Sequence, residues 1–273
     1  MPPASAEQWL VWRPDRGFAA PPAVGELVLV DSWLVEEGTV RGLDLHRARF
    51  FDGCRDQGLP AHALEAFWQD LVGELPREGA WFPRVELRRD EGLALWVRPA
   101  PERTATIRVL LWPHPDPRGT PHRKGPDLEL LAGVRARARE AGADDALFTT
   151  PDGFVTESAT ASLLWWEGDA LVRPDADKHL LPGVTSTLIE RIAQQTGVPV
   201  RRGAARPEHL PDREVWLVNA LHGIRPVTEW TGFDRPAAPA RHAARWQRLL
   251  RETAEGLPQL SGPSAAMTAV HHS

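Results

Sequence analysis

A polar segment rich in proline and glycine, residues 113–126 (PHPDPRGTPHRKGP), divides this chain of 273 residues into two parts. The segment has no hydrophobic periodicity, which is typical of a connection between domains. Strand-like and helical patterns lie on both sides of it, without a regular alternation of strand and helix. The sequence therefore predicts an α+β fold with two sheet-containing lobes. We expect a smaller α/β domain at residues 1–117, a larger mixed β domain with helices at 118–254, and a poorly packed tail at 255–273.

Apolar periodicity predicts the elements of each lobe. Residues 1–22 are rich in proline and alanine and are expected to be loosely ordered around a short strand. The first lobe should then contain helices at 45–53 and 61–73 and strands at 26–35, 39–43, 81–88, 93–98 and 104–112. The second should contain helices at 127–141, 185–196 and 240–253 and strands at 146–150, 154–157, 162–166, 170–172, 198–202 and 214–219, with a short segment at 226–230.

The composition argues against several classes of protein. The net charge of -5 gives no reason to expect nucleic acid or an anionic membrane as a partner. The single cysteine, Cys54, cannot form an intramolecular disulfide or a thiolate metal cluster. No apolar stretch approaches the ~20 residues of a membrane helix, and the first residues do not resemble a signal peptide. We therefore expect a soluble cytoplasmic protein without a metal site.

Lysine is rare in this chain. Of the 32 basic side chains only Lys124 and Lys178 are lysines, and the arginine codons of a GC-rich genome would explain the bias. Any chemistry that requires a lysine amine therefore has two candidates. Lys124 lies in the polar segment, between Arg123 and Gly125 and just ahead of a predicted helix. Read from its neighbours alone, it would be a solvated linker lysine.

A possible anion site follows later in the chain. Residues 182–185 (PGVT) run from a turn into a predicted helix. The free N–H groups of Val184 and Thr185, together with the Thr185 hydroxyl, could bind an anion at the positive end of that helix. Read alone, Thr185 could equally be an ordinary helix cap.

Two more charged positions are candidates. Glu157 ends a predicted strand, where a buried carboxylate would need a cationic partner, whereas an exposed hairpin glutamate would need none. His46 and Arg49 are three residues apart, so that one helical face can present both, and Arg49 could reach a phosphate. An arginine on the surface of a helix is the alternative interpretation.

An amine, an anion site and an acid are what a pyridoxal phosphate cofactor requires, for its aldehyde, its phosphate and its pyridine nitrogen respectively. None of these signals is specific singly, but their order along the chain resembles the class-IV aminotransferase family. Residues 45–50 (LHRARF) resemble the family's H-x-x-R-L stretch, and 152–158 (DGFVTES) resemble its D-G-x-V-x-E-G. Residues 181–185 (LPGVT) match its L-P-G-[IV]-T turn, and 214–227 (EVWLVNALHGIRPV) match its late strand and loop.

The resemblance implies a role for each matching residue. Lys124 would be the Schiff-base lysine, and Glu157 would pair with the pyridine nitrogen. The phosphate would be bound by Arg49, Val184 and Thr185, and Ala220 and Leu221 of the late loop would also contact the cofactor. The resemblance further implies the two-domain fold type IV of pyridoxal enzymes, as in D-amino-acid aminotransferase, a small amine or amino acid as substrate, and a homodimer.

Departures from the family pattern concern the substrate more than the cofactor. Ser32 lies where the family usually has G-x-F-E-T, Ser162 replaces an asparagine, and Ser186 replaces an arginine. Residues 219–224 (NALHGI), which include His222, resemble aminodeoxychorismate lyases. Residues 96–99 (WVRP) resemble the Y-I-R-P of branched-chain enzymes, in which Arg98 would bind a substrate carboxylate rather than end a surface strand. The absence of tyrosine fits poorly with the transaminases of the family.

The pattern therefore favours an aminodeoxychorismate lyase-like enzyme, with Ser32, Arg98 and His222 as candidate substrate-binding residues. A branched-chain or D-amino-acid transaminase is the first alternative. A pyridoxal-phosphate-binding protein without turnover is the second, suggested by the three serines at positions 32, 162 and 186.

Overall fold

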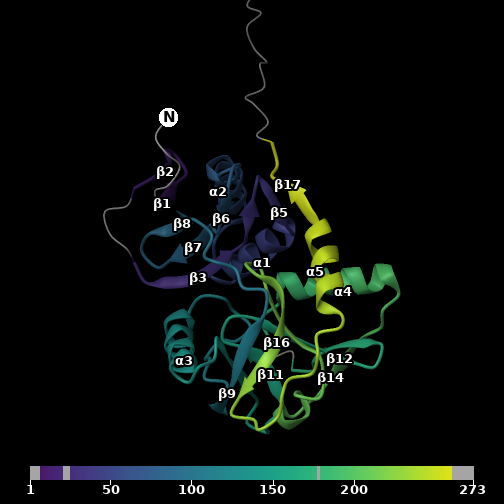
Figure 1. Cartoon of the computed structure of the whole chain (residues 1–273). Coiled ribbons are helices and arrows are strands. Elements are labelled where there is room, and N and C mark those ends of the chain that lie inside the picture. The colour runs from purple at the N-terminus through teal and green to yellow at the C-terminus, as the bar shows by residue number, and fades with distance from the viewer. Residues whose placement is uncertain (1–6, 21–24, 177–178, 260–273) are drawn as a thin grey trace, which may run out of the picture.

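The computed structural model describes residues 7–20, 25–176 and 179–259. These residues form two lobes stacked one above the other, with the N-terminal strands and α2 in the upper lobe and α3, β9 and β14 in the lower lobe (Figure 1). Each lobe combines sheet with helix, which confirms the predicted α+β fold with two sheet-containing lobes. Lys178, the second lysine, lies outside the described residues.

The smaller lobe is built on a five-stranded antiparallel sheet with the order β2-β1-β8-β7-β3. The sheet shares one hydrophobic core with α1 (Leu43–Asp56) and α2 (Ala61–Glu74), whose buried faces include Phe50, Phe67 and Leu71. A four-stranded sheet of order β17-β5-β4-β6 lies in the same lobe. The strands are β1 (Gln8–Arg13), β2 (Gly17–Ala19), β3 (Leu27–Ser32), β4 (Val35–Glu36), β5 (Thr39–Arg41), β6 (Ala80–Trp81), β7 (Arg84–Arg88), β8 (Gly92–Val97) and β17 (Ala254–Gly256).

The larger lobe contains an eight-stranded mixed sheet with the order β11-β10-β9-β16-β15-β12-β13-β14. β11 also pairs with β12, and this pairing places Glu157 opposite Ser162. The helices α3 (Leu128–Glu140), α4 (Val184–Thr196) and α5 (Ala243–Glu252) pack on this lobe through separate hydrophobic clusters. The strands are β9 (Ile107–Pro115), β10 (Asp145–Thr149), β11 (Val155–Ser158), β12 (Ser162–Glu167), β13 (Ala170–Pro174), β14 (Val200–Gly203), β15 (Val215–Asn219) and β16 (Gly223–Thr231), and a 3-10 turn lies at Pro207–His209.

Strand pairing differs from the predicted domain division in two places. The sequence predicts the strand at 104–112 in the first lobe, but β9 pairs in parallel with β10 and β16 of the larger sheet. The two main sheets therefore divide between β8 and β9, ahead of residue 117. The first residues of the predicted tail are packed, because β17 pairs with β5 and Leu257 is buried in the core of the smaller lobe. Periodicity identifies a strand but not its partner, since the partner lies far away in the chain.

Gly125 brings the polar segment against the smaller lobe. Its backbone lies so close to β3 that a Cβ atom would be 2.7 Å from the Leu29 Cα, and its φ of +145° is one that other residues rarely adopt. The Val30 N–H donates to the Lys124 carbonyl at 2.8 Å in the same contact. This contact fixes Lys124 beside the end of β3, where the two lobes meet.

We expect Gly125→Ala to lower the free energy of unfolding by at least ~1–3 kcal/mol, because neither backbone can withdraw from the new methyl group. Gly133→Ala is the matched control, since Gly133 lies in α3 with open space around its Cβ position. That change should leave stability unchanged or raise it by up to about 1 kcal/mol. Urea unfolding measures both variants, and equal effects would contradict the role given to Gly125.

Candidate active site

A cavity of about 870 Å³ is lined by residues of both lobes. Its volume lies in the range of roughly 300–1,000 Å³ that is usual for small-molecule sites. All the candidate residues of the sequence line it, which brings together segments from β3 to the hairpin between β15 and β16. They are Ser32, Arg49, Arg98, Lys124, Glu157, Val184, Thr185, Ala220, Leu221 and His222.

A buried carboxylate, Asp31, organises the end of the cavity nearest the smaller lobe. Its two oxygens accept hydrogen bonds from Nε and Nη2 of Arg49, at 2.8 and 2.7 Å, and one oxygen lies 2.8 Å from Nδ1 of His46. Burial alone would raise the pKa of Asp31, but Arg49 and His46 more than offset it and hold the pKa well below its usual range. Asp31 is therefore ionised, and its two oxygens hold the Arg49 guanidinium in a fixed orientation.

Lys124 faces this charged group from the polar segment. The surface that it keeps accessible belongs to the cavity, and the protein surrounds the rest of the side chain. Burial is the largest cause that lowers the pKa of its amine to about 8; Asp31 opposes this shift, and Arg49, Arg84 and Arg98 add to it. A substantial fraction of the amine is therefore neutral near physiological pH, as a nucleophile requires. This environment excludes a solvated linker lysine.

The start of α4 and Arg49 lie next to one another. The Arg49 Nη1 donates to the Pro182 carbonyl at 2.9 Å, which ties α1 to the turn before α4. The helix begins at Val184 after Gly183, and no side chain caps its first turn. A Cβ on Gly183 would be 2.7 Å from the hydroxyls of both Ser162 and Ser186, so a side chain at this position would require both hydroxyls to move. Backbone N–H groups, the Thr185 hydroxyl and a guanidinium thus form a set of donors that could bind an anion.

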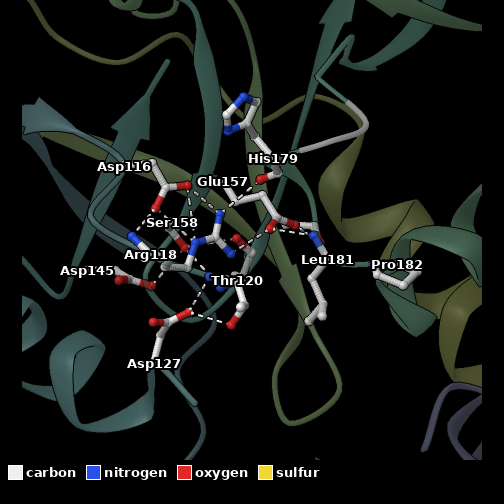
Figure 2. Close-up of polar contacts among 12 residues, drawn as sticks. Asp116, Arg118, Thr120, Asp127, Asp145, Glu157, Ser158, His179, Leu181 and Pro182 are labelled. Atoms are coloured by element: carbon white, nitrogen blue, oxygen red, sulfur yellow. Dashed lines mark hydrogen bonds and ion pairs between the residues drawn. The ribbon is translucent and has the colours of Figure 1, made fainter. Parts of the chain in front are cut away.

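Glu157 lies on β11 and is 3% exposed. The Ser162 hydroxyl donates to Oε1 at 2.9 Å, whereas Arg118 Nη1 and the Leu181 N–H donate to Oε2 at 3.0 and 2.9 Å (Figure 2). Burial raises the pKa of the Glu157 carboxyl, and Arg118 is the largest opposing influence. The interpretation as an exposed hairpin glutamate is therefore wrong.

Arg118 is a site residue that the sequence did not reveal. Figure 2 shows its guanidinium between Asp116 and Glu157, with bonds to both carboxylates and to the His179 carbonyl. In the sequence Arg118 is only one of many arginines, six positions before Lys124, and this position alone is a weak signal. Asp31 was also missed, because nothing in its local sequence indicates that it is buried.

The three predicted substrate-binding residues line different parts of the cavity. Ser32 is buried, and its N–H donates to Asp31 at 2.7 Å. Arg98 donates through Nε to the Phe82 carbonyl at 3.0 Å and stacks on Trp96, which leaves the rest of its guanidinium for the cavity. His222 accepts a bond from the Thr104 N–H at its Nδ1.

Metal-ligand groups and membrane-spanning helices are both absent from the described part of the chain. It contains no group of three histidine, cysteine or acidic side chains that could hold a metal ion. None of its helices is long and apolar enough to cross a membrane.

Comparison with known proteins assigns the family. The model of the amino-transferase class IV family matches residues 28–230, and this chain belongs to that family. Aminodeoxychorismate lyase from Bacillus subtilis is 32% identical over 95 residues, which are 33% of this chain and 32% of that protein. Branched-chain-amino-acid aminotransferase-like protein 2 from Arabidopsis thaliana is 28% identical over 106 residues, 38% of this chain and 19% of that protein. The matches thus span a third or less of either relative.

A solved structure supports the fold over a much longer span. The PLP-bound form of a hypothetical aminotransferase from Mycobacterium tuberculosis superposes with a TM-score of 0.73 and 19% identity. The superposition covers 90% of this chain and 98% of that one. At this level of identity the likeness concerns the fold, which agrees with the two-lobe arrangement.

We expect modification of Lys124 by an amine-reactive acylating reagent to rise with pH around a midpoint near 8, because the neutral amine reacts and burial lowers its pKa to about 8. In the urea-unfolded chain the same lysine should titrate near ~10.4. Peptide mapping by mass spectrometry follows Lys124 and Lys178 separately. Equal midpoints for Lys124 in the folded and the unfolded chain would contradict the burial argument.

We expect Arg118→Met to lower the free energy of unfolding by about 3–5 kcal/mol at pH 7, because it leaves two buried carboxylates without their cation. The loss should shrink as the pH falls, since burial raises the pKa of Glu157 and a protonated Glu157 needs no cationic partner. Arg108→Met breaks the exposed pair with Asp144 and should change the free energy of unfolding far less, because solvent screens that pair. Denaturant titrations at several pH values test both variants, and a loss that is the same at every pH would argue against the pairing.

Proposed function

We propose that this chain binds pyridoxal 5'-phosphate at Lys124 and acts on a small amino carboxylate by a lyase-type elimination, as aminodeoxychorismate lyase does. The observation that carries the proposal is one cavity that combines a lysine of lowered pKa, an anion-binding helix start and a buried carboxylate. When bound, the cofactor supplies an aldehyde that condenses with amines and a pyridinium ring that withdraws electrons from the bonds to be broken. Assembly as a homodimer stays a prediction of the family resemblance.

The phosphate fits the set formed by Arg49, Val184 and Thr185. Arg49 keeps its side chain 14% exposed although Asp31 and the Pro182 carbonyl hold it, so it is fixed but still accessible. The N–H groups in the first turn of any α-helix have no partner within the helix, and they point in the same direction. A phosphate with two negative charges would accept hydrogen bonds both from the Arg49 guanidinium and from the N–H groups at the start of α4.

The pyridine nitrogen fits Glu157. An ionised carboxylate has about four lone-pair sites. Oε2 accepts two hydrogen bonds and Oε1 accepts one, from Ser162. One site on Oε1 is therefore left for a protonated ring nitrogen, and Arg118 opposes the rise that burial causes in the pKa of Glu157.

Lys124 would act twice in this proposal. Its neutral amine holds the cofactor until an amino substrate replaces it, and the released Nζ then takes up and returns protons at the substrate. Asp31 and Arg49 oppose one another in setting the pKa of Lys124, so the amine can serve as both base and acid near neutral pH. In the elimination, aminodeoxychorismate would lose its side chain as pyruvate and leave 4-aminobenzoate.

The late hairpin supports the lyase over the transaminase. Residues 219–224 resemble the lyase pattern, and the relative from Bacillus subtilis is an aminodeoxychorismate lyase. The chain also has no tyrosine to place around an amino acid substrate.

A transaminase is the second candidate because Arg98 lines the cavity. The stacking on Trp96 and the bond to Phe82 hold Arg98 in position for a carboxylate, as the branched-chain pattern implies. A binding protein without turnover is less favoured, because the serines that depart from the family pattern at positions 162 and 186 still make hydrogen bonds within the site. Ser162 supports Glu157, and Ser186 donates to the Gly183 carbonyl at 2.8 Å.

We expect the purified holoprotein to release pyruvate from aminodeoxychorismate and Lys124→Ala to lose this activity by at least ~10³-fold, because the described residues place no other lysine amine in the cavity. Pyruvate is measured by a coupled assay, and absorbance spectra with a panel of amines follow the cofactor. Amino transfer to a keto acid without pyruvate release would replace the lyase by the transaminase. A cofactor spectrum that no amine changes would favour the binding protein.

A further inference from the structure

Gln247 of α5 contacts the hairpin between β15 and β16, although it does not itself line the cavity. Its Oε1 accepts a hydrogen bond from the Ile224 N–H at 2.7 Å, and its Nε2 donates to the His222 carbonyl at 3.1 Å. The amide thus presents an acceptor to a donor and a donor to an acceptor, which fixes its orientation. Gly223 lies between the two bonded residues, and a Cβ there would be 2.7 Å from the Gln247 Oε1. Gln247 also lies beyond residues 28–230, so the family pattern does not supply this contact.

The helix that carries Gln247 is held at its start and along its buried face. The carboxylate of Glu214, the residue before β15, accepts hydrogen bonds from the N–H groups of residues 241–243 at 2.7 to 3.0 Å. The first N–H groups of a helix have no partner within it, so this carboxylate stabilises the start of α5. Trp246 and Leu250 are buried in the hydrophobic cluster that α5 shares with α4, and Figure 1 shows the two helices next to one another. Gln247 therefore reaches the hairpin from a firmly held helix.

The hairpin presents side chains to the cavity. Those that line it from the loop are Ala220, Leu221 and His222. Arg225 follows on β16, lines the same cavity and is 2% exposed. Thr104 contacts two of these side chains, because its N–H donates to Nδ1 of His222 at 3.2 Å and its hydroxyl accepts from Nη1 of Arg225 at 3.4 Å. Both bonds are longer than the 2.7 Å bond between Gln247 and the Ile224 N–H, so Gln247 holds the hairpin more firmly than Thr104 does.

We propose that Gln247 is a positioning residue of the site, which sets through the backbone of residues 222–224 where the hairpin side chains lie in the cavity. The inference rests on the proposed function, in which neighbouring residues of the hairpin contact the cofactor. Arg41 holds the hairpin at a different point, since it donates to the Ala220 carbonyl at 3.0 Å. Gln247 therefore acts on the half of the hairpin that carries His222.

The imidazole of His222 reports the position of this half. Burial is the largest cause that lowers the pKa of His222 to about 4, and Arg225, Arg135 and Arg103 add to it. These influences weaken with distance and when water enters. A hairpin released from Gln247 should therefore have a His222 pKa closer to the ordinary value of 6.5.

The first test follows His222 by NMR over pH in the full chain without cofactor. Gln247→Met removes both hydrogen bonds at similar side-chain length, and we expect the pKa of His222 to rise from about 4 to ~5 or above. Leu249→Ala is the matched control, because Leu249 packs against the same hydrophobic cluster but lies two positions along the helix, on a different face from Gln247. This control should lower Tm and leave the pKa of His222 unchanged.

The second test measures the affinity for pyridoxal phosphate by absorbance titration at pH 8. We expect the Kd to rise about 10-fold in Gln247→Met, and also in Gln247→Glu, whose carboxylate has no donor for the His222 carbonyl. Leu249→Ala should keep the wild-type Kd. If Gln247→Met does not fold, the Kd of Gln247→Glu decides the question.

Each outcome supports or overturns the proposal. A pKa of His222 that changes equally in Gln247→Met and Leu249→Ala, or in neither, would make Gln247 a stabilising residue only and overturn it. A changed pKa with an unchanged Kd would support the positioning of His222 and contradict the cofactor contacts assigned to Ala220 and Leu221. If the wild type does not bind pyridoxal phosphate, the proposed function fails, whereas the pKa of His222 still decides this inference.

Discussion

The buried carboxylate of Asp31 holds the two lobes in register at the cavity. From its position on β3 it binds Arg49 and His46 of α1, and Arg49 in turn donates to the carbonyl before α4. The neighbouring Val30 N–H binds the backbone of Lys124. One strand end of the smaller lobe thus fixes both the amine and the anion-binding helix start of the larger lobe. A neutral residue at position 31 would leave the half-buried Arg49 without its counterion, which is the costly way to break such a pair.

The reactivity of Lys124 and the ability to bind anions have the same physical origin. Arg49, Arg84 and Arg98 contribute to lowering the pKa of Lys124, and these are also residues that can bind phosphate or carboxylate. When an anion binds, its charge cancels part of theirs, so the pKa of Lys124 should rise again. Without a bound anion the cavity therefore favours a neutral, nucleophilic Lys124 amine, whereas with a bound anion it favours an amine that holds a proton.

Local patterns in the sequence predicted what depends on local interactions. The helix expected at 61–73 is α2 (Ala61–Glu74), and the helix expected at 185–196 is α4 (Val184–Thr196), because a repeating apolar face and a Pro-Gly turn are visible in a single segment. The candidate residues that the ordered motifs identified also line one cavity. Long-range pairing was not visible: β9 joins the larger sheet through partners on both sides. Arg118, Asp31 and Arg225 were missed for the same reason, since burial and a partner far along the chain define each of them.

The hairpin between β15 and β16 has a backbone that is held in place while some of its side chains can vary, so the substrate could change without a change of fold. Its backbone is held by Arg41, which donates to the Ala220 carbonyl, and by Gln247 of α5, which bonds to the His222 carbonyl and the Ile224 N–H. Gly223, with a φ of +72° and Gln247 against it, cannot carry a side chain there. These contacts all involve backbone groups of the hairpin, so the side chains of His222 and Arg225 are free to vary. Under the proposed function, the same short segment would contact the cofactor and select the substrate through different atoms, and this separation would explain why motifs identify the cofactor more readily than the reaction.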